Sequence, residues 1–405
     1  MGTDEFLAFC AQAGADPFLV VNDGSGTAEE AARWVAYCNE PPHGEQGRRR
    51  AANGHPKPYG VRLWGVGNEV WGRWQIGHTD AAGYVARLRE FVAAMRQADP
   101  RLQIVAVGDG ILDDAPENPG RQWNEAVLRG AGEGIDYLSF HIYQPEKEGW
   151  QEASDPEALH HVVCAAPLDV EAITGRVAAQ IEALAPGRKI RVALDEWNLW
   201  LPPPPEAQSM HQVVYTLRDA LYTAGMFHVF HRQCQALTLA NLAQLVNVLP
   251  AIVTDERRAW ATAIYYPFLL YWQMDRLALE VRADAPAFDS PAYGPNIAAH
   301  RGVPYLDATA TCDAERRRLV LGLINRHPAR KVEVLAPLRG FGALRPAEAW
   351  LLTGPNPLAA NTPDRPEQVR AVVGPLPDIR WEGLRYEMPP ASVAVLVLAQ
   401  SEKDT

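Results

Sequence analysis

Short apolar runs, bounded by glycine or polar residues, recur through the first two thirds of the chain, and stretches with helical periodicity separate them. Runs of this length predict buried strands, and their alternation with helices is typical of a parallel sheet with right-handed crossovers. We expect six strands, in the segments 17–23, 61–67, 103–107, 136–141, 191–194 and 236–239.

The predicted helices carry start and stop signals. Thr27 stands three residues before Glu30, as in a capping box, and Gly14 is placed to close the first helix. Thr79 is expected to cap a long helix that ends before Pro100. The other predicted helices cover about 4–13, 28–38, 123–129, 170–184, 207–232 and 257–274.

Three segments are expected to lack regular structure. The arginine run 48–50 is interpreted as a solvated loop, and 146–167 as a long irregular insertion. Pro202–Pro205 predicts a rigid extended stretch, because proline cannot continue a helix or a central strand.

Beyond about residue 276 the pattern changes to short runs that alternate with period two and are broken by glycine, proline and asparagine. Such alternation is typical of strands with one buried face. We therefore predict two domains, a (β/α) barrel over 1–275 and an all-β sandwich over 276–405.

Composition excludes several classes of function. The formal charge of −11 gives no support to a nucleic-acid partner, which binds a concentrated basic surface. No apolar run is long enough for a membrane span, and the acidic N-terminus does not resemble a signal peptide. The five cysteines are widely spaced and include no C-x-x-C pair, which favours a reducing compartment. We expect a soluble, cytoplasmic protein.

Two glutamates follow predicted strands at the point where each strand ends. Glu69 lies in WGVGNEVWGRW and Glu196 in ALDEWNLW. Two carboxylates at the carboxyl ends of parallel strands are what glycoside hydrolysis requires, although acids at strand ends also cap helices. Tryptophans crowd both segments, and flat aromatic faces suit sugar rings, although packing is the ordinary role of a tryptophan.

Five segments together resemble the α-L-arabinofuranosidases of glycoside hydrolase family 51. They are GTDEF (2–6), WGVGNEVWGRWQIGH (64–78), LSFHIY (138–143), ALDEWNLW (193–200) and LANLAQLVNVL (239–249). The resemblance follows the family order and extends over essentially the whole chain. It implies a retaining, exo-acting α-L-arabinofuranosidase that releases terminal non-reducing arabinofuranose from oligosaccharides derived from arabinan or arabinoxylan.

The resemblance assigns roles to individual residues. Glu69 would be the general acid/base and Glu196 the nucleophile of a double displacement, and Asn68 would bind the sugar 2-hydroxyl. For Asn68 the alternative is an ordinary turn residue at a strand end. No metal or organic cofactor is implied.

Four further residues are implied to contact the substrate. His141 and Tyr143 would line the sugar site, with the tyrosine supporting the nucleophile, although on pattern alone His141 fits a core histidine. Trp200 would form a subsite wall. Gln244 would read sugar hydroxyls, and its alternative is an ordinary polar residue of a helix. Relatives are often oligomeric, so a homo-oligomer is compatible with the resemblance, but no residue pattern marks an interface.

The resemblance begins at Gly2, inside the family pattern. A (β/α)₈ barrel of the TIM type needs eight strands, so we expect the first two to be missing. This expectation leaves two alternatives open. One is another retaining barrel glycosidase, a β-xylosidase or an endoglucanase, and the other is a truncated, catalytically inactive carbohydrate-binding homologue.

Overall fold

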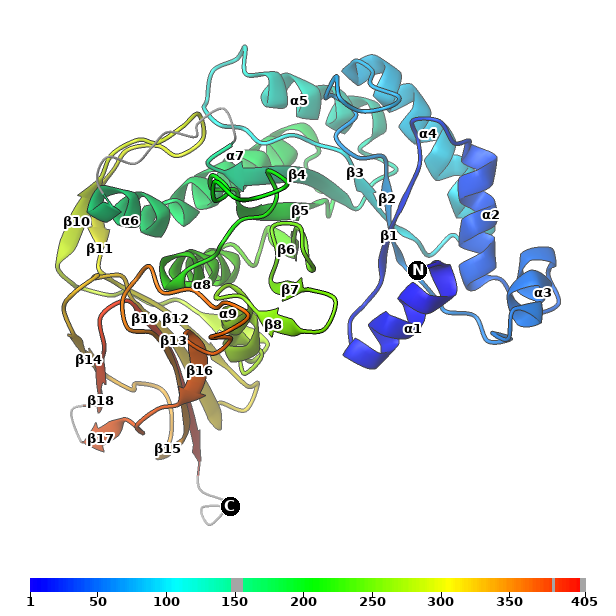
Figure 1. Ribbon diagram of the computed structural model, residues 1–405. Helices are drawn as coiled ribbons and strands as arrows, with labels where there is room; N and C mark the ends of the chain where they lie inside the picture. Colours follow the sequence, from blue (N-terminus) through cyan, green and yellow to red (C-terminus); the bar gives the residue numbers. More distant parts are fainter. Residues whose placement is uncertain (147–155, 381–382, 401–405) are drawn as a thin grey trace. The chain divides into compact units, whose positions relative to one another are not determined.

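The computed structural model describes residues 1–146, 156–380 and 383–400. In it, six strands form one sheet, in which each strand pairs with the next one along the chain (Figure 1). They are β1 (Phe18–Val21), β2 (Leu63–Val66), β3 (Gln103–Ala106), β4 (Tyr137–Gln144), β5 (Arg191–Leu199) and β6 (Leu237–Leu242). The pairings β1–β2, β2–β3 and β3–β4 are parallel. The predicted six strands of a barrel are confirmed.

The two N-terminal helices end and begin as the sequence predicts. Helix α1 (Thr3–Ala13) closes at Gly14, whose φ of 68° is a left-handed conformation that favours glycine. Helix α2 (Ala28–Asn39) begins at Thr27, whose hydroxyl accepts from the Glu30 amide while the Glu30 carboxylate accepts from the Thr27 amide. The predicted capping box is confirmed, and it fixes the start of α2 directly after the β1 loop.

A tyrosine of α4 (Ala81–Ala98) ties together the carboxyl ends of two strands. The hydroxyl of Tyr84 donates to the Val66 carbonyl over 2.8 Å and accepts from the Val107 amide over 2.7 Å. The side chain is fully buried. The predicted cap at Thr79 is wrong by one residue, because Asp80 accepts the capping bond from the Gly83 amide. Tyr84 therefore fixes the points at which the chain leaves β2 and β3 and enters the loops that follow them.

The prediction of a solvated loop at 48–50 is wrong. These residues belong to helix α3 (Glu45–Ala52), and Arg50 is completely buried. Its guanidinium donates to the backbone carbonyls of His55 over 3.0 Å and Glu40 over 2.8 Å, and also to that of Tyr37. The planar guanidinium can supply several donors at once, so it satisfies carbonyls that no regular element pairs.

Three of the other predicted segments differ from the structure. The insertion 146–167 contains helix α6 (Pro156–Ala165), and 147–155 lies outside the described residues. Helix α8 (Leu217–Arg232) begins ten residues later than predicted, because Thr216 and Asp219 form its capping box. The segment 257–274 contains strand β8 (Ala259–Ala261), paired with β7 (Ile252–Thr254), and only the short helix α9 (Tyr265–Tyr271).

The remaining helices of the first half agree with the predicted pattern. Helix α5 (Pro119–Ala131) follows β3, and its N-cap Asn118 accepts from the Arg121 amide. Helix α7 (Pro167–Leu184) precedes β5. None of the helices in the described part of the chain is both long and apolar enough to cross a membrane.

Packing divides the chain into two compact units. The first contains Met1–His141, Ile173–Asp195 and Ala236–Leu239. The second contains Ile142–Ala172, Glu196–Gln235 and Ala240–Thr405. Strands β4, β5 and β6 therefore each contribute residues to both units. The two domains that we expect from sequence, 1–275 and 276–405, stay a prediction.

The second unit contains the β-rich C-terminal part. One sheet has the strand order β16–β15–β19–β13–β12–β9 and another has β14–β18–β17. Their bounds are β9 (Leu277–Leu279), β12 (Leu306–Cys312), β13 (Arg318–Asn325), β14 (Val332–Ala336), β15 (Leu344–Thr353), β16 (Arg370–Val373), β17 (Asp378–Arg380), β18 (Gly383–Met388) and β19 (Ser392–Gln400). A two-stranded sheet, β10 (Ala287–Ser290) and β11 (His300–Pro304), accompanies them.

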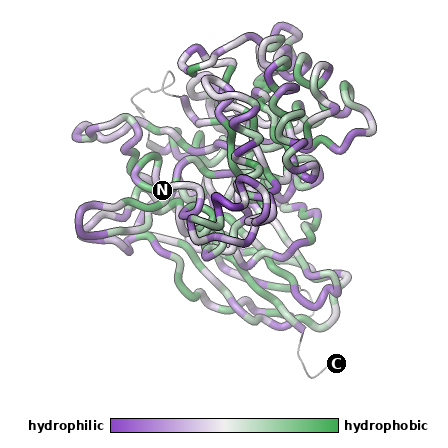
Figure 2. The backbone as a smooth tube through the Cα atoms, turned by 90° about the vertical axis from the view of Figure 1, so that its right-hand side faces the viewer, coloured by the Kyte–Doolittle hydropathy of each residue, from purple (hydrophilic) through white to green (hydrophobic). Residues whose placement is uncertain are grey.

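The central strand β19 stabilises this part of the chain by contributing buried residues to two hydrophobic cores. Its residues from Ser392 to Leu398 are all buried, and the chain leading to the C-terminus is correspondingly hydrophobic in Figure 2. Alternate residues contribute to two cores: Leu396 belongs to the core that contains Leu384 and Tyr386 of β18, and Val395 to the core that contains Leu221 of α8. Burying a large aliphatic side chain contributes about 1.5–3 kcal/mol. The predicted β-rich C-terminal domain is confirmed.

Candidate active site

The loop after β2 places Glu69 in an unusual backbone conformation. Glu69 has a φ of 46° and Gly67 a φ of 84°, both in the left-handed region. A Cβ at Gly67 would lie 2.5 Å from Oδ1 of Asp23, so this position also requires the absence of a side chain. Non-glycine residues rarely adopt such a conformation, and such strain concentrates at functional sites.

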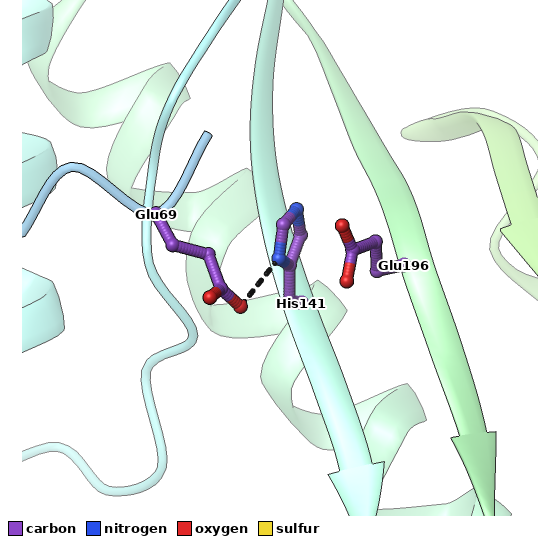
Figure 3. Close-up of side chains that lie close together, drawn as sticks. All are labelled: Glu69, His141 and Glu196. Carbon is purple, nitrogen blue, oxygen red and sulfur yellow. Dashed lines mark hydrogen bonds and ion pairs between the residues drawn. The ribbon is translucent and has the colours of Figure 1, made fainter. Parts of the chain in front are cut away.

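Two groups of the first unit hold the Glu69 carboxylate. Oε1 lies 2.9 Å from Nδ1 of His141 on β4, and the indole N–H of Trp74 donates to Oε2 over 2.9 Å. Figure 3 shows Glu69 on its loop with the hydrogen bond to His141. Trp74 is itself 67% exposed and packs edge to face on Trp71, with ring centroids 5.4 Å apart. The carboxylate is therefore held beside an exposed aromatic surface.

These contacts change the acidity of Glu69. Burial raises the pKa of the carboxyl, but the hydrogen bond and charge of His141 and the bonds from Trp74 and Gln75 outweigh it, so the pKa lies below its ordinary value. The carboxylate form is therefore favoured when His141 is protonated.

His141 contacts a second carboxylate of the same unit. Its Nε2 lies 3.2 Å from Oδ1 of Asp195, the residue that precedes Glu196 on β5. The side chains of His141 and Asp195 are only 10% and 13% exposed. Each ring nitrogen of His141 thus faces a carboxylate, Glu69 on one side and Asp195 on the other.

The second unit places Tyr143 beside Glu196. The phenol of Tyr143 donates to Oε2 of Glu196 over 2.7 Å. Trp200 packs edge to face on Tyr143 at 5.5 Å and stacks on His211 at 5.0 Å. Its indole N–H donates to the Met210 carbonyl, which fixes the ring. Tyr143 is therefore held between the predicted nucleophile and an aromatic wall.

Asn198, next to the buried Trp197, connects β5 to the segment after β6. Its amide donates to the carbonyls of Ala243 over 2.8 Å and Leu249 over 3.0 Å. Gln244 lies between these two carbonyls along the chain and is exposed. It follows strand β6 and lies outside any helix, so the expected helical alternative for Gln244 is wrong.

The predicted site residues fall into two groups. Within the first unit, Glu69 contacts His141, and Asn68 is exposed beside Glu69 on the same loop. Within the second unit, Glu196, Tyr143 and Trp200 are linked in a chain of contacts. The roles of these residues stay predictions.

Sequence reasoning missed two contributors, Asp195 and Trp74. Asp195 directly precedes Glu196 in the DEWN segment, so the doubled acid was a visible signal. The tryptophans of the WGRW segment were considered only for their aromatic faces, whereas the indole N–H of one of them, Trp74, also donates to Glu69.

The side chains in Figure 3, Glu69, His141 and Glu196, carry donor atoms of the kinds that bind divalent metals. Both ring nitrogens of His141 already face carboxylates in the first unit, an arrangement suited to sharing a proton. We therefore assign no metal ion to these residues.

Two family models match the chain. Residues 1–158 match the model described as the α-L-arabinofuranosidase 1 domain. Residues 195–392 match the one described as the α-L-arabinofuranosidase C-terminal domain. Together the two matches cover both glutamates and most of the C-terminal sheets.

Individual relatives agree with these models. An intracellular exo-α-(1→5)-L-arabinofuranosidase of Streptomyces lividans is 30% identical over 91% of this chain, and the chain spans 55% of that protein's length. The arabinose complex of an α-L-arabinofuranosidase from Thermotoga maritima superposes with a TM-score of 0.84 at 29% identity, covering 99% of this chain and 79% of that one. A further arabinofuranosidase crystal structure has a TM-score of 0.82 at 30% identity, covering 98% of this chain and 78% of that one.

Proposed function

This chain belongs to the α-L-arabinofuranosidases of glycoside hydrolase family 51, and from that premise we propose that it hydrolyses terminal non-reducing α-L-arabinofuranosides with retention of configuration. The observation that carries the proposal is the contrast between the partners of the two glutamates, Glu69 on the loop after β2 and Glu196 within β5. Glu69 contacts an imidazole, whereas Glu196 accepts a phenolic hydrogen bond. Two carboxylates with different environments can take the roles of acid and nucleophile.

In the first step, Glu196 attacks the anomeric carbon of the arabinofuranosyl group, and the bond to the leaving oxygen breaks. Glu69, in its protonated form, delivers its proton to that oxygen, so the aglycone leaves as a neutral alcohol. The Tyr143 phenol supports this step because its 2.7 Å hydrogen bond fixes the attacking carboxylate and limits its rotation.

In the second step, the ionised Glu69 accepts a proton from water, and the resulting hydroxide equivalent attacks the anomeric carbon. The bond to Glu196 breaks, arabinose leaves, and Glu69 is protonated again. Two inversions at the same carbon give net retention. In this step the contacts with His141 and Trp74 fix the position of the Glu69 carboxylate, which must act as the base.

The substrate class comes from the relatives and from the aromatic residues near the glutamates. The Streptomyces relative is named as an exo-enzyme for α-(1→5)-linked arabinofuranose, so we propose oligosaccharides derived from arabinan or arabinoxylan. Trp71 and Trp74 offer ring faces beside Glu69, and Trp200 offers one beside Tyr143. In the proposal Asn68 and Gln244, both exposed, bind sugar hydroxyls. We also propose a cytoplasmic location, as the same relative is named intracellular.

A panel of 4-nitrophenyl glycosides tests this function. The proposal predicts that kcat/KM for the α-L-arabinofuranoside exceeds that for the β-D-xyloside and for cello-oligosaccharides. A matched Glu196→Gln variant, which keeps the shape and removes the charge, serves as the blank for contaminating activity. Higher activity on the xyloside or cello-oligosaccharide favours another retaining glycosidase. Arabinose binding without turnover of any glycoside favours a non-catalytic homologue.

A further inference from the structure

The position of His141 between two carboxylates constrains its protonation. A neutral imidazole has one N–H donor and one acceptor nitrogen, so it cannot donate to both Glu69 and Asp195. Either an imidazolium faces both carboxylates, or a neutral ring accepts a hydrogen bond from a protonated Glu69. The two arrangements contain the same number of protons and differ only in whether one proton lies on Nδ1 of His141 or on Oε1 of Glu69.

Asp195 favours a positive charge on His141. Its Oδ1 is buried, and no described residue donates a hydrogen bond to that atom. A buried carboxylate oxygen without a donor requires a nearby positive charge to offset its desolvation. Nε2 of a protonated His141, 3.2 Å from this oxygen, supplies such a charge.

Three charged groups of the first unit, Asp23, Arg87 and Asp195, act on the buried Tyr84. Asp23 and Arg87 pair with each other, with 3.6 Å between Oδ2 and a guanidinium nitrogen. Burial raises the pKa of Tyr84, and the carboxylates of Asp23 and Asp195 raise it further, whereas Arg87 lowers it. Glu196 follows Asp195 along β5 and is drawn with His141 in Figure 3. Asp23 has Arg87 as its partner, whereas Oδ1 of Asp195 lies 3.2 Å from Nε2 of His141.

We propose that Asp195 is a positioning residue that keeps the catalytic proton on the His141–Glu69 pair, with His141 storing the proton that Glu69 delivers. The inference rests on the proposed function, since it concerns the acid that protonates the leaving group. The lowered pKa of Glu69 agrees with it, because a glutamate that ionises easily needs a nearby source for the proton.

The proton transfer balances as follows. The Nδ1–H bond of the imidazolium breaks, its electron pair stays on Nδ1, and an O–H bond forms on Oε1 of Glu69. Glu69 then passes this proton to the leaving oxygen, and His141 remains neutral with its N–H facing Asp195. When water is deprotonated in the second step, the proton on Glu69 returns to Nδ1, and the starting state is restored.

The first test is the pH profile of kcat/KM on an unactivated arabino-disaccharide, or on whichever glycoside the wild type hydrolyses best. The Asp195→Asn variant keeps the shape and removes the charge that favours the proton. Its basic limb should move to lower pH by about 1–3 units, the usual effect of a nearby charge. Asp195→Glu should restore the limb towards the wild-type position.

A matched control is Asp136→Asn, which removes a structural carboxylate at the start of β4. Asp136 accepts from the Ile104 amide and from Arg96, away from His141. The basic limb of the kcat/KM profile of Asp136→Asn should stay at the wild-type pH, even if this variant is less stable than the wild type. A uniform loss of rate in Asp195→Asn at every pH, with the limb unmoved, overturns the proposal.

The second test does not need activity. In protein labelled with ¹⁵N-histidine, the His141 signals are assigned by their loss in His141→Gln, and their titration is followed in wild type and Asp195→Asn. The proposal predicts two protonated ring nitrogens in the wild type near neutral pH and a lower midpoint in the variant. A neutral His141 with the same midpoint in both proteins contradicts it. An inactive wild type that shows the predicted titration contradicts the proposed function alone.

Discussion

The Tyr143 phenol and the Glu196 carboxylate are joined by a 2.7 Å hydrogen bond, and both residues lie on strands that end at the candidate site. A hydrogen bond to a charged group is stronger than a neutral one and fixes the carboxylate in one orientation. In the proposed mechanism this orientation directs an oxygen of Glu196 to the anomeric carbon, so the contact should matter for turnover.

Tyr143→Phe removes only the phenolic donor. Such a bond contributes about 1.5–3 kcal/mol, and we expect kcat to fall about 10- to 100-fold with a smaller change in KM. Steady-state kinetics on 4-nitrophenyl α-L-arabinofuranoside measure this. Tyr137→Phe, at the other end of the same strand, is the control and should keep the wild-type kcat. Equal losses in both variants would indicate a general effect on β4.

Glu196→Ala should remove the nucleophile and reduce turnover by about 10⁴-fold or more. Added azide can then attack the anomeric carbon directly, in a single inversion. We expect the product to be the β-L-arabinofuranosyl azide, identified by NMR of the isolated compound. The α-azide from this variant contradicts the assignment of Glu196 as nucleophile.

Glu69→Ala should slow substrates according to their leaving group. General acid catalysis contributes about 10²- to 10⁴-fold, and we expect most of this loss on an unactivated arabino-oligosaccharide. The first step with 4-nitrophenyl arabinofuranoside should change little, because nitrophenolate leaves without a proton. Azide should yield the α-azide, since Glu196 still acts first. Equal losses on both substrates argue against Glu69 as the acid.

Gly67→Ala tests whether the loop geometry positions Glu69. The new Cβ would lie 2.5 Å from Oδ1 of Asp23, in a backbone conformation with a φ of 84°. We expect a loss of more than about 1 kcal/mol in the free energy of unfolding and a fall in kcat. Gly60→Ala is the matched control, since its φ of 72° carries the same strain but no atom lies within 4 Å. If the two variants have equal kcat, the approach of Asp23 does not position Glu69.

Arg50→Met tests the role of the buried guanidinium. The variant keeps much of the aliphatic stem but leaves the carbonyls of Tyr37, Glu40 and His55 without their donor. Each unsatisfied buried group costs about 1–3 kcal/mol, so we expect a clear fall in the urea midpoint. The exposed neighbour Arg49→Met should stay within about 0.5 kcal/mol of wild type. Equal midpoints for the two variants would show that the carbonyls find other partners.

Much of the first half of the fold follows from local signals. The capping box at Thr27 and the glycine at position 14 are complete within a few residues, so the ends of α1 and α2 could be predicted. The apolar strands were equally local, because buried parallel strands are continuous hydrophobic runs. Both glutamates were found for the same reason, although β5 continues past Glu196 to Leu199 and is longer than predicted.

The structure differs from the sequence prediction where contacts between residues far apart in the chain determine the conformation. Arg50 is buried because backbone carbonyls from outside its helix converge on it, and a run of three arginines gives no sign of this. The segment 257–274 is apolar enough for a helix, but part of it pairs as β8 with β7 instead. The link from Asp195 through His141 to Glu69 joins three separate segments, so neither spacing nor composition could reveal it.

The stereochemistry of transfer tests the central claim most directly. The protein is incubated with 4-nitrophenyl α-L-arabinofuranoside in buffer that contains methanol, and the methyl arabinofuranoside formed is identified by ¹H NMR. Unlike free arabinose, this product does not change its anomeric configuration in solution. A double displacement through Glu196 predicts the methyl α-L-arabinofuranoside. Formation of the β-anomer, or no transfer and no arabinose release at all, contradicts the account.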